Sequence, residues 1–145
     1  MFIQELTNSG AIPSLELMAR FAGARQRVIA HNIANLDTPD FRPLDVSPQE
    51  FQKALGKAIE ARRAATGESG PLKFEGTDQV KVDAEGGVSL NPATPSGNIL
   101  FHDRNNRDLE SLMAQQAENV AVFRTSVELL RSRYAVLQSA ISERV

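Results

Sequence analysis

The chain of 145 residues has no cysteine, no tryptophan and a single tyrosine. Without cysteine it forms neither disulfides, nor thiolate metal sites, nor a cysteine nucleophile. No stretch approaches the roughly 18 consecutive apolar residues that a membrane-spanning helix needs. An excess of charge of one sign is also lacking: the chain has 16 Lys and Arg and 18 Asp and Glu, so its formal net charge is −2. No basic face accumulates, so nucleic acid is not an expected partner.

Signatures of catalysis are scarce as well. The only histidines are His31 and His102, and neither has a second ligand at the spacing of a helical metal motif. The sequence has no nucleophile elbow, phosphate-binding glycine loop or paired-carboxylate motif. We therefore expect no enzymatic activity, no cofactor, no metal and no small-molecule substrate.

The C-terminal end lacks the residues that break helices. From Arg107 to Ser142 there is no glycine and no proline. From Val120 onward the apolar residues are spaced three and four apart in alternation, which predicts a long helix with a heptad seam. The members of this helix-pairing seam are Val120, Phe123, Val127, Leu130, Tyr134, Leu137 and Ile141. At 1.5 Å per residue the helix would be about 50 Å long, so another helix must cover the seam.

The other end of the chain supplies a partner helix. Its pattern predicts a helix that begins near Pro13, since proline fits a first helical turn, and ends near Asn35 or Leu36, ahead of Pro39. Leu15, Ala22 and Ile29 recur at heptad spacing and form its side of the helix-pairing seam.

The middle of the chain is rich in glycine and proline. Ser47-Pro48-Gln49-Glu50 is a capping-box pattern, which predicts a short helix ending before Gly67. Alternating residues on either side of Gly86-Gly87 predict a small β-hairpin, expected to order only against a neighbouring surface. The expected fold is mainly α: two long terminal helices paired as a coiled-coil-like bundle, with a short helix and a small irregular or hairpin insert. The expected parts are a helix over 1–36, an insert over 37–106 and a helix over 107–145, in one structural unit.

The segment from Ala30 to Phe41 is the most specific in the chain. It predicts a helix end at Asn35, a Thr-Pro turn and an aromatic residue. Asn32 falls on or beside the seam, where a buried polar group can fix register. On the residues alone, an ordinary helix end and turn without wider meaning stays open.

This segment resembles the signature of the flagellar axial proteins, which include rod, hook and hook-associated subunits. The matching residues are Ala30, Asn32, Ile33, Ala34, Asn35, Thr38, Pro39 and Phe41. The family usually has glycine where Asp40 stands, which affects the turn. A second segment, 102–110 with Met113 and 117–119, is similar to the start of the C-terminal helix in proximal-rod subunits, which usually have glycine at Arg104 and an apolar residue at Arg107. There Asn105 or Asn106 is the expected N-cap of the helix.

The resemblance implies a structural subunit of the bacterial flagellar basal-body rod. Its terminal helices would assemble with other copies and other rod proteins, and it would contact the export gate and membrane-ring components. It implies a periplasmic rod location after type III export, and the first residues lack a cleavable signal pattern. Two other hypotheses stay open: a soluble two-helix adaptor that binds one partner without polymerising, and a small enzyme.

Overall fold

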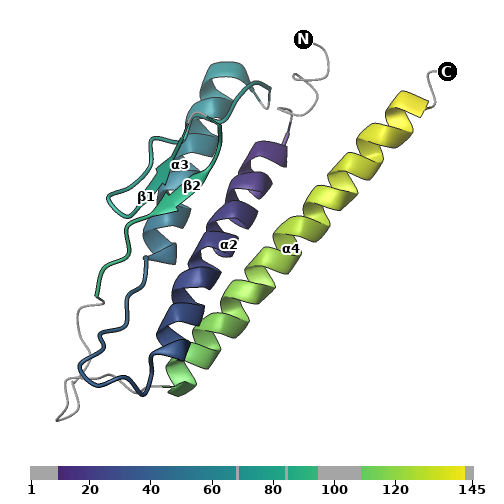
Figure 1. Cartoon of the computed structure of the whole chain (residues 1–145). Helices are drawn as coiled ribbons and strands as arrows, with labels where there is room; N and C mark the ends of the chain where they lie inside the picture. Colours follow the sequence, from purple (N-terminus) through teal and green to yellow (C-terminus); the bar gives the residue numbers. More distant parts are fainter. Residues whose placement is uncertain (1–9, 68, 84, 95–108, 143–145) are drawn as a thin grey trace.

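The protein is mainly helical, as its sequence predicts. The computed structural model describes residues 10–67, 69–83, 85–94 and 109–142 (Figure 1). The elements are α2 (Ile12–Ala34), α3 (Pro48–Thr66), β1 (Val80–Val82), β2 (Val88–Leu90) and α4 (Leu109–Ser142). In Figure 1, α2 lies in the middle, with α3 and the hairpin on one side and α4 on the other. The predicted pairing of the two long helices is confirmed by the packing of α2 against α4.

Local capping explains where α2 begins and ends. Pro13 stands in its first turn, and Asn35 is its C-cap. The backbone N–H of Asn35 donates to the carbonyl of His31, 3.2 Å away, and closes the last turn. Both ends agree with the predicted bounds.

None of the described helices combines the length and apolarity that a membrane crossing requires.

Helix α3 has the predicted cap. The Ser47 hydroxyl accepts a hydrogen bond from the backbone N–H of Glu50 at 3.2 Å, and Pro48 follows in the first turn. Gly67 ends the helix with φ +72°, a backbone conformation that costs little only for glycine. The cap at Ser47 therefore fixes the residue at which α3 begins, directly after the proline-rich segment.

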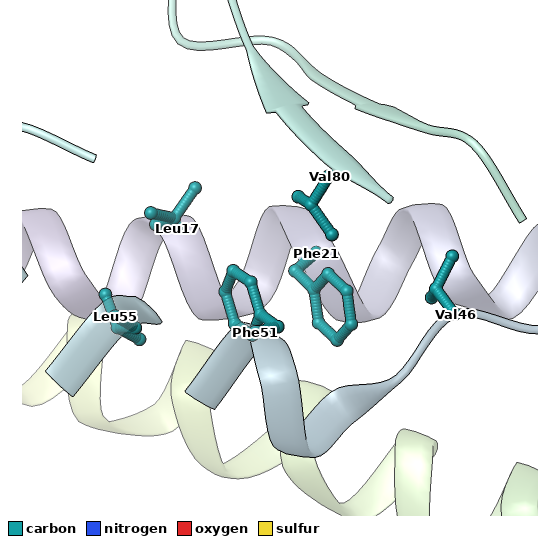
Figure 2. Close-up of a cluster of buried hydrophobic side chains, with 6 residues drawn as sticks. All are labelled: Leu17, Phe21, Val46, Phe51, Leu55 and Val80. Atoms are coloured by element: carbon teal, nitrogen blue, oxygen red, sulfur yellow. The ribbon is translucent and has the colours of Figure 1, made fainter. Parts of the chain in front are cut away.

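The β-hairpin is confirmed, and its neighbour is the chain itself. β1 and β2 pair antiparallel, with Val80 opposite Leu90 and Val82 opposite Val88. Val80 is only 1% exposed because it points into the core between α2 and α3 (Figure 2). This burial supplies the support that two isolated strands lack in water.

The hydrophobic core joins α2, α3 and the hairpin. Its buried members are Leu17, Phe21, Val46, Phe51, Leu55 and Val80 (Figure 2). The rings of Phe21 and Phe51 are stacked, with centroids 3.9 Å apart and an interplanar angle of 6°. No described residue of α4 belongs to this cluster. The core therefore holds one side of α2, and α4 packs on another.

Candidate assembly surface

The side of α2 that contacts α4 includes Ala22, whose carbonyl accepts a hydrogen bond from Asn119. That Leu15 and Ile29 face α4 as well stays a prediction. Leu15, Ala22 and Ile29 lie at seven-residue spacing, and all three are buried. They share a helix face because seven residues are close to two full turns. Ala22 is fully buried, and its small side chain lets α4 come close to the α2 backbone.

The facing row of α4 is partly polar. Its buried side chains are Leu112, Asn119 and Ser126, again seven residues apart. The Asn119 Nδ2 donates to the carbonyl of Ala22 at 2.9 Å and lies 3.0 Å from Gln26 Oε1. The Ser126 hydroxyl donates to a carbonyl of its own helix. A buried amide at such a position favours one register of two paired helices.

The predicted seam of α4 lies beside this buried row on the helix surface, since Val120 and Val127 directly follow Asn119 and Ser126 in the sequence. Within it, Val120, Val127, Leu130 and Leu137 are half-buried, whereas Phe123, Tyr134 and Ile141 are 41%, 40% and 56% exposed. A single chain therefore covers the seam only in part. That its residues pack fully in an assembly stays a prediction.

Tyr134 ties the far end of α4 to α2. Its hydroxyl donates to the Glu16 carboxylate at 2.8 Å. That hydrogen bond raises the pKa of Tyr134, with a smaller contribution from desolvation. A raised pKa means that the hydrogen bond is complete below the tyrosine's ordinary pKa and is lost as the pH rises through the raised one. The contact is exposed to solvent, so its contribution to stability is small.

The exposed apolar surface is concentrated on one helix. Among the described residues, the large hydrophobic side chains left exposed are Leu109, Met113, Phe123, Leu129, Tyr134, Val136 and Ile141. All seven belong to α4. Scattered exposed hydrophobic residues are normal, but seven large ones on a single helix make α4 the candidate interaction surface of the described chain.

Asn32, in the predicted assembly motif, organises its own chain. Its side chain is 1% exposed. The Nδ2 donates to the carbonyl of Leu44 at 2.6 Å, and the Oδ1 accepts the N–H of Leu44 at 3.1 Å. The residue is buried, as a register-fixing role needs, but its partner is the segment after α2 and not another helix. It attaches that segment to the end of α2.

The rest of the motif forms the turn. The Asn35 side chain donates to the carbonyl of His31 at 2.9 Å, and the Thr38 N–H donates to the carbonyl of Asn35. The Phe41 ring stands edge-on to His31, with centroids 5.5 Å apart. Asp40 has φ +59°, the left-handed conformation for which glycine is better suited. The turn thus keeps the backbone shape that glycine would favour.

The motif also has an outer surface. Ala34, Thr38 and Pro39 are exposed, whereas Ile33 and Phe41 are half-buried. Thr38 is exposed and also holds the turn through Asn35. That the exposed residues of the motif contact a neighbouring molecule stays a prediction.

One buried ion pair was not predicted from the sequence. Arg25 is 4% exposed, and its Nε and Nη2 donate to the two carboxylate oxygens of Asp45 at 2.9 and 2.6 Å. Asp45 also pairs by backbone hydrogen bonds with Ala93. Charged residues are usually exposed, so neither one is expected to be buried from the sequence. Their separation of 20 positions also gives no sequence pattern that would predict the pair. The pair fixes the segment after α2 beside that helix.

The described residues contain no group of three or more His, Cys, Asp or Glu side chains that could hold a metal ion. A groove of about 450 Å³ lies where the start of α2, the end of α3 and α4 meet. Its lining consists of arginine and apolar side chains and Ser14, without a carboxylate or a histidine.

Two long helices are paired, and one of them has exposed large apolar side chains along its length; this is the architecture of a helical protein. The chain is 30% identical to the flagellar basal body rod protein FlgB of Bacillus subtilis (strain 168) over 135 residues, or 92% of this chain and 95% of that protein. No protein-family model matches the sequence. The chain belongs to the flagellar basal-body rod protein family, and it is a FlgB-like structural component of the rod.

Proposed function

We propose that this chain is a proximal-rod subunit. It assembles with other copies and with other rod proteins through α2 and α4, and the assembled rod transmits torque. The observation that carries the proposal is the exposed apolar surface of α4, in a chain that is similar to FlgB over nearly its whole length.

The size of that surface favours assembly over pairing with one partner. Each of its seven large side chains is about half exposed, so complete burial would contribute about 1 kcal/mol apiece, or about 7 kcal/mol together. Association costs on the order of 4–15 kcal/mol in lost freedom. One neighbour that covers part of the surface is therefore held weakly. Several neighbours at once hold a subunit firmly, which suits a rod.

The finer partners and the location rest on the resemblance. A proximal-rod subunit would lie next to the export gate and the membrane ring in the periplasm, after export without signal cleavage. A chain without cysteine suits passage in an unfolded state, since it forms no bridges on the way.

Deletion of the gene in its source organism tests the rod role. Swimming should be lost, and purified basal bodies should lack rods or carry rods stalled at the inner membrane. The wild-type gene should restore both. Normal swimming with complete basal bodies would reject the proposal.

The adaptor hypothesis predicts a different behaviour in solution. Light scattering from the purified chain, alone and with other rod proteins, should rise steeply with concentration if subunits assemble. A plateau at a one-to-one complex would favour the adaptor. The enzyme hypothesis predicts a thermal shift with some member of a metabolite panel.

A further inference from the structure

We propose that a chain of polar contacts couples the β-hairpin to the far part of α4, so that displacement of the hairpin turn releases that part of the helix. The far part of α4 comprises residues 127–142. The contacts run through Gly86, Arg20, Glu16 and Tyr134, which together form the polar relay. The coupling is a property of the single chain, so it goes beyond the rod role and does not depend on it.

The far part of α4 is held less firmly than the part before it. All three buried residues of the helix precede it: Leu112, Asn119 and Ser126. Within it, Val136 and Ile141 are 61% and 56% exposed. In Figure 1, α4 also leans away from α2 toward its C-terminal end. Little apolar burial opposes the separation of this part from α2, so polar contacts can decide its position.

The side chains of the polar relay use different atoms for their two neighbours. The Tyr134 hydroxyl donates to Glu16 Oε1 at 2.8 Å. The other carboxylate oxygen, Glu16 Oε2, lies 3.9 Å from Arg20 Nη2. Arg20 Nη1 donates to the carbonyl of Gly86. The relay therefore runs without a break from α4 through two residues of α2 to the hairpin turn.

The hairpin turn directs the carbonyl that Arg20 binds. Gly86 has φ +80°, a backbone conformation that glycine adopts at little cost. Its N–H donates to the carbonyl of Asp83 at 3.0 Å, and the Asp83 side chain accepts a hydrogen bond from the Gly87 N–H. These bonds fix the direction of the Gly86 carbonyl, so movement of the turn removes it from Arg20.

Neighbouring contacts of the relay share side chains, which is the condition for coupling. Glu16 and Arg20 lie on the same side of α2, because they are four residues apart. Both act on the Tyr134 hydroxyl: Glu16 raises its pKa, chiefly by accepting the hydrogen bond, and Arg20 lowers it. Loss of the Gly86 contact frees the Arg20 guanidinium and thereby changes the surroundings of the Glu16 carboxylate. Contacts that share a partner in this way are not additive.

The coupling affects one part of α4 and leaves the other in place. Displacement of the hairpin turn loosens the far part, and separation of the far part loosens the turn, since coupling between two sites is reciprocal. The part before it keeps its own contact, because Asn119 bonds to Ala22 and Gln26 of α2. The position of the far part, with its exposed apolar side chains, therefore depends on the hairpin.

Distances between spin labels test the coupling, because a chain without cysteine is labelled only where a cysteine is introduced. The far pair joins α3 to the far part of α4 and carries Glu60→Cys with Gln138→Cys. The near pair joins the same α3 position to the earlier part of α4 and carries Glu60→Cys with Glu118→Cys. All three side chains are exposed, so labels there leave the packing intact.

Gly86→Ala breaks the relay at the hairpin, since a methyl group at Gly86 would collide with the Arg20 guanidinium. Gly70→Ala is the matched control. Gly70 has a similar φ of +87°, but a methyl group there would meet only Thr66, at 3.8 Å. Both substitutions strain a backbone with positive φ, and only the first one reaches the relay.

In Gly86→Ala, the ratio of chains with the native far-pair distance to chains with a longer one should fall about two- to fivefold, as the loss of an exposed polar contact gives. The near pair should keep its native distance, as should both pairs in Gly70→Ala. An unchanged far pair in Gly86→Ala would overturn the proposal. An equal change in Gly70→Ala would overturn it too, because backbone strain would then be the cause.

Arg20→Met decides the question if Gly86→Ala disrupts both pairs, because it breaks the relay without strain in the turn. It should change the far pair and leave the near pair as it is; a native far-pair distance would contradict the coupling.

Tyr134→Phe tests the other end of the relay, since it removes only the hydroxyl. The far pair should change as it does in Gly86→Ala, and adding Gly86→Ala to Tyr134→Phe should have no further effect. A double variant in which the two effects simply add would show that the contacts are independent and that no coupling exists.

Discussion

The two long helices differ in how much of each is covered by the rest of the chain. Ten of the 23 residues of α2 are buried, against three of the 34 residues of α4. α2 has the core on one side and α4 on another, whereas among the described elements α4 packs mainly on α2. The comparison separates two parts of the chain: α2 with α3 and the hairpin forms the core, and α4 carries the exposed large apolar side chains of the described residues.

Composition follows the same division. The core side of α2 carries Leu17 and Phe21 against Phe51, which is large apolar surface removed from water. The α2–α4 contact includes a hydrogen-bonded Asn119 and a Ser126, whose polar groups contribute less net stability. The most apolar packing of the fold therefore lies on the side of α2 that faces α3 and the hairpin.

The largest effect that we expect concerns assembly. Leu130→Asp places a charge in the predicted seam of α4 and should abolish rod assembly while the protein is still expressed. Leu130 is half-buried in the single chain, so much of its contact area remains for neighbours. Swimming and basal-body imaging measure the effect, and Ala135→Asp on the outer face is the control. Unimpaired swimming of the Leu130 variant would count against the proposed packing.

The next prediction compares the same substitution, phenylalanine to alanine, in the core and on α4. Phe51→Ala should lower the free energy of unfolding by about 3–5 kcal/mol, since it empties the centre of the core. Phe123→Ala on α4 should cost about 1 kcal/mol, because that ring is 41% exposed. Urea unfolding of the two purified variants measures both. Equal costs would break the distinction between core and open helix.

A third prediction concerns the ion pair that attaches the segment after α2. Arg25→Met leaves the Asp45 carboxylate half-enclosed without its guanidinium and should cost about 3 kcal/mol of stability. Adding Asp45→Asn removes that charge, so the double variant should recover part of the loss. Thermal unfolding of the two variants measures the difference. A double variant less stable than Arg25→Met would contradict this account.

Most of the fold was predictable because its signals are local. The cap at Ser47, the turn at Gly86-Gly87 and the end of α2 at Asn35 each follow from a few adjacent residues. The Arg25–Asp45 pair was not predictable, since nothing near either residue marks it as buried.

The face of α4 that contacts α2 shows a second limit of prediction from the sequence. Apolar spacing picks out Val120, Val127 and the rest of the seam, yet the fully buried row includes Asn119 and Ser126. A periodic pattern reports every apolar contact that a helix makes, including contacts with other molecules. It does not say which row faces the chain's own α2.

A smaller effect separates the two polar residues of that row. Asn119→Ala removes hydrogen bonds that reach across to α2 and should cost about 1–2 kcal/mol. Ser126→Ala removes a bond to its own helix and should change stability by no more than about 0.5 kcal/mol. Urea unfolding compares them. If Ser126→Ala costs as much as Asn119→Ala, burial and not hydrogen bonding across the pair sets the contact.

The smallest expected effect is a gain in stability at two helix glycines. Gly23→Ala in α2 and Gly56→Ala in α3 should each stabilise by up to about 1 kcal/mol, because alanine favours a helix interior. A methyl group at Gly23 would lie 3.8 Å from the Phe123 ring, an ordinary contact, and one at Gly56 would meet nothing within 4 Å. Thermal unfolding compares the two. A loss at Gly23 alone would mean that α4 lies closer to α2 than described. A gain in stability combined with lost swimming would instead show that Gly23 is approached by a neighbour in the rod.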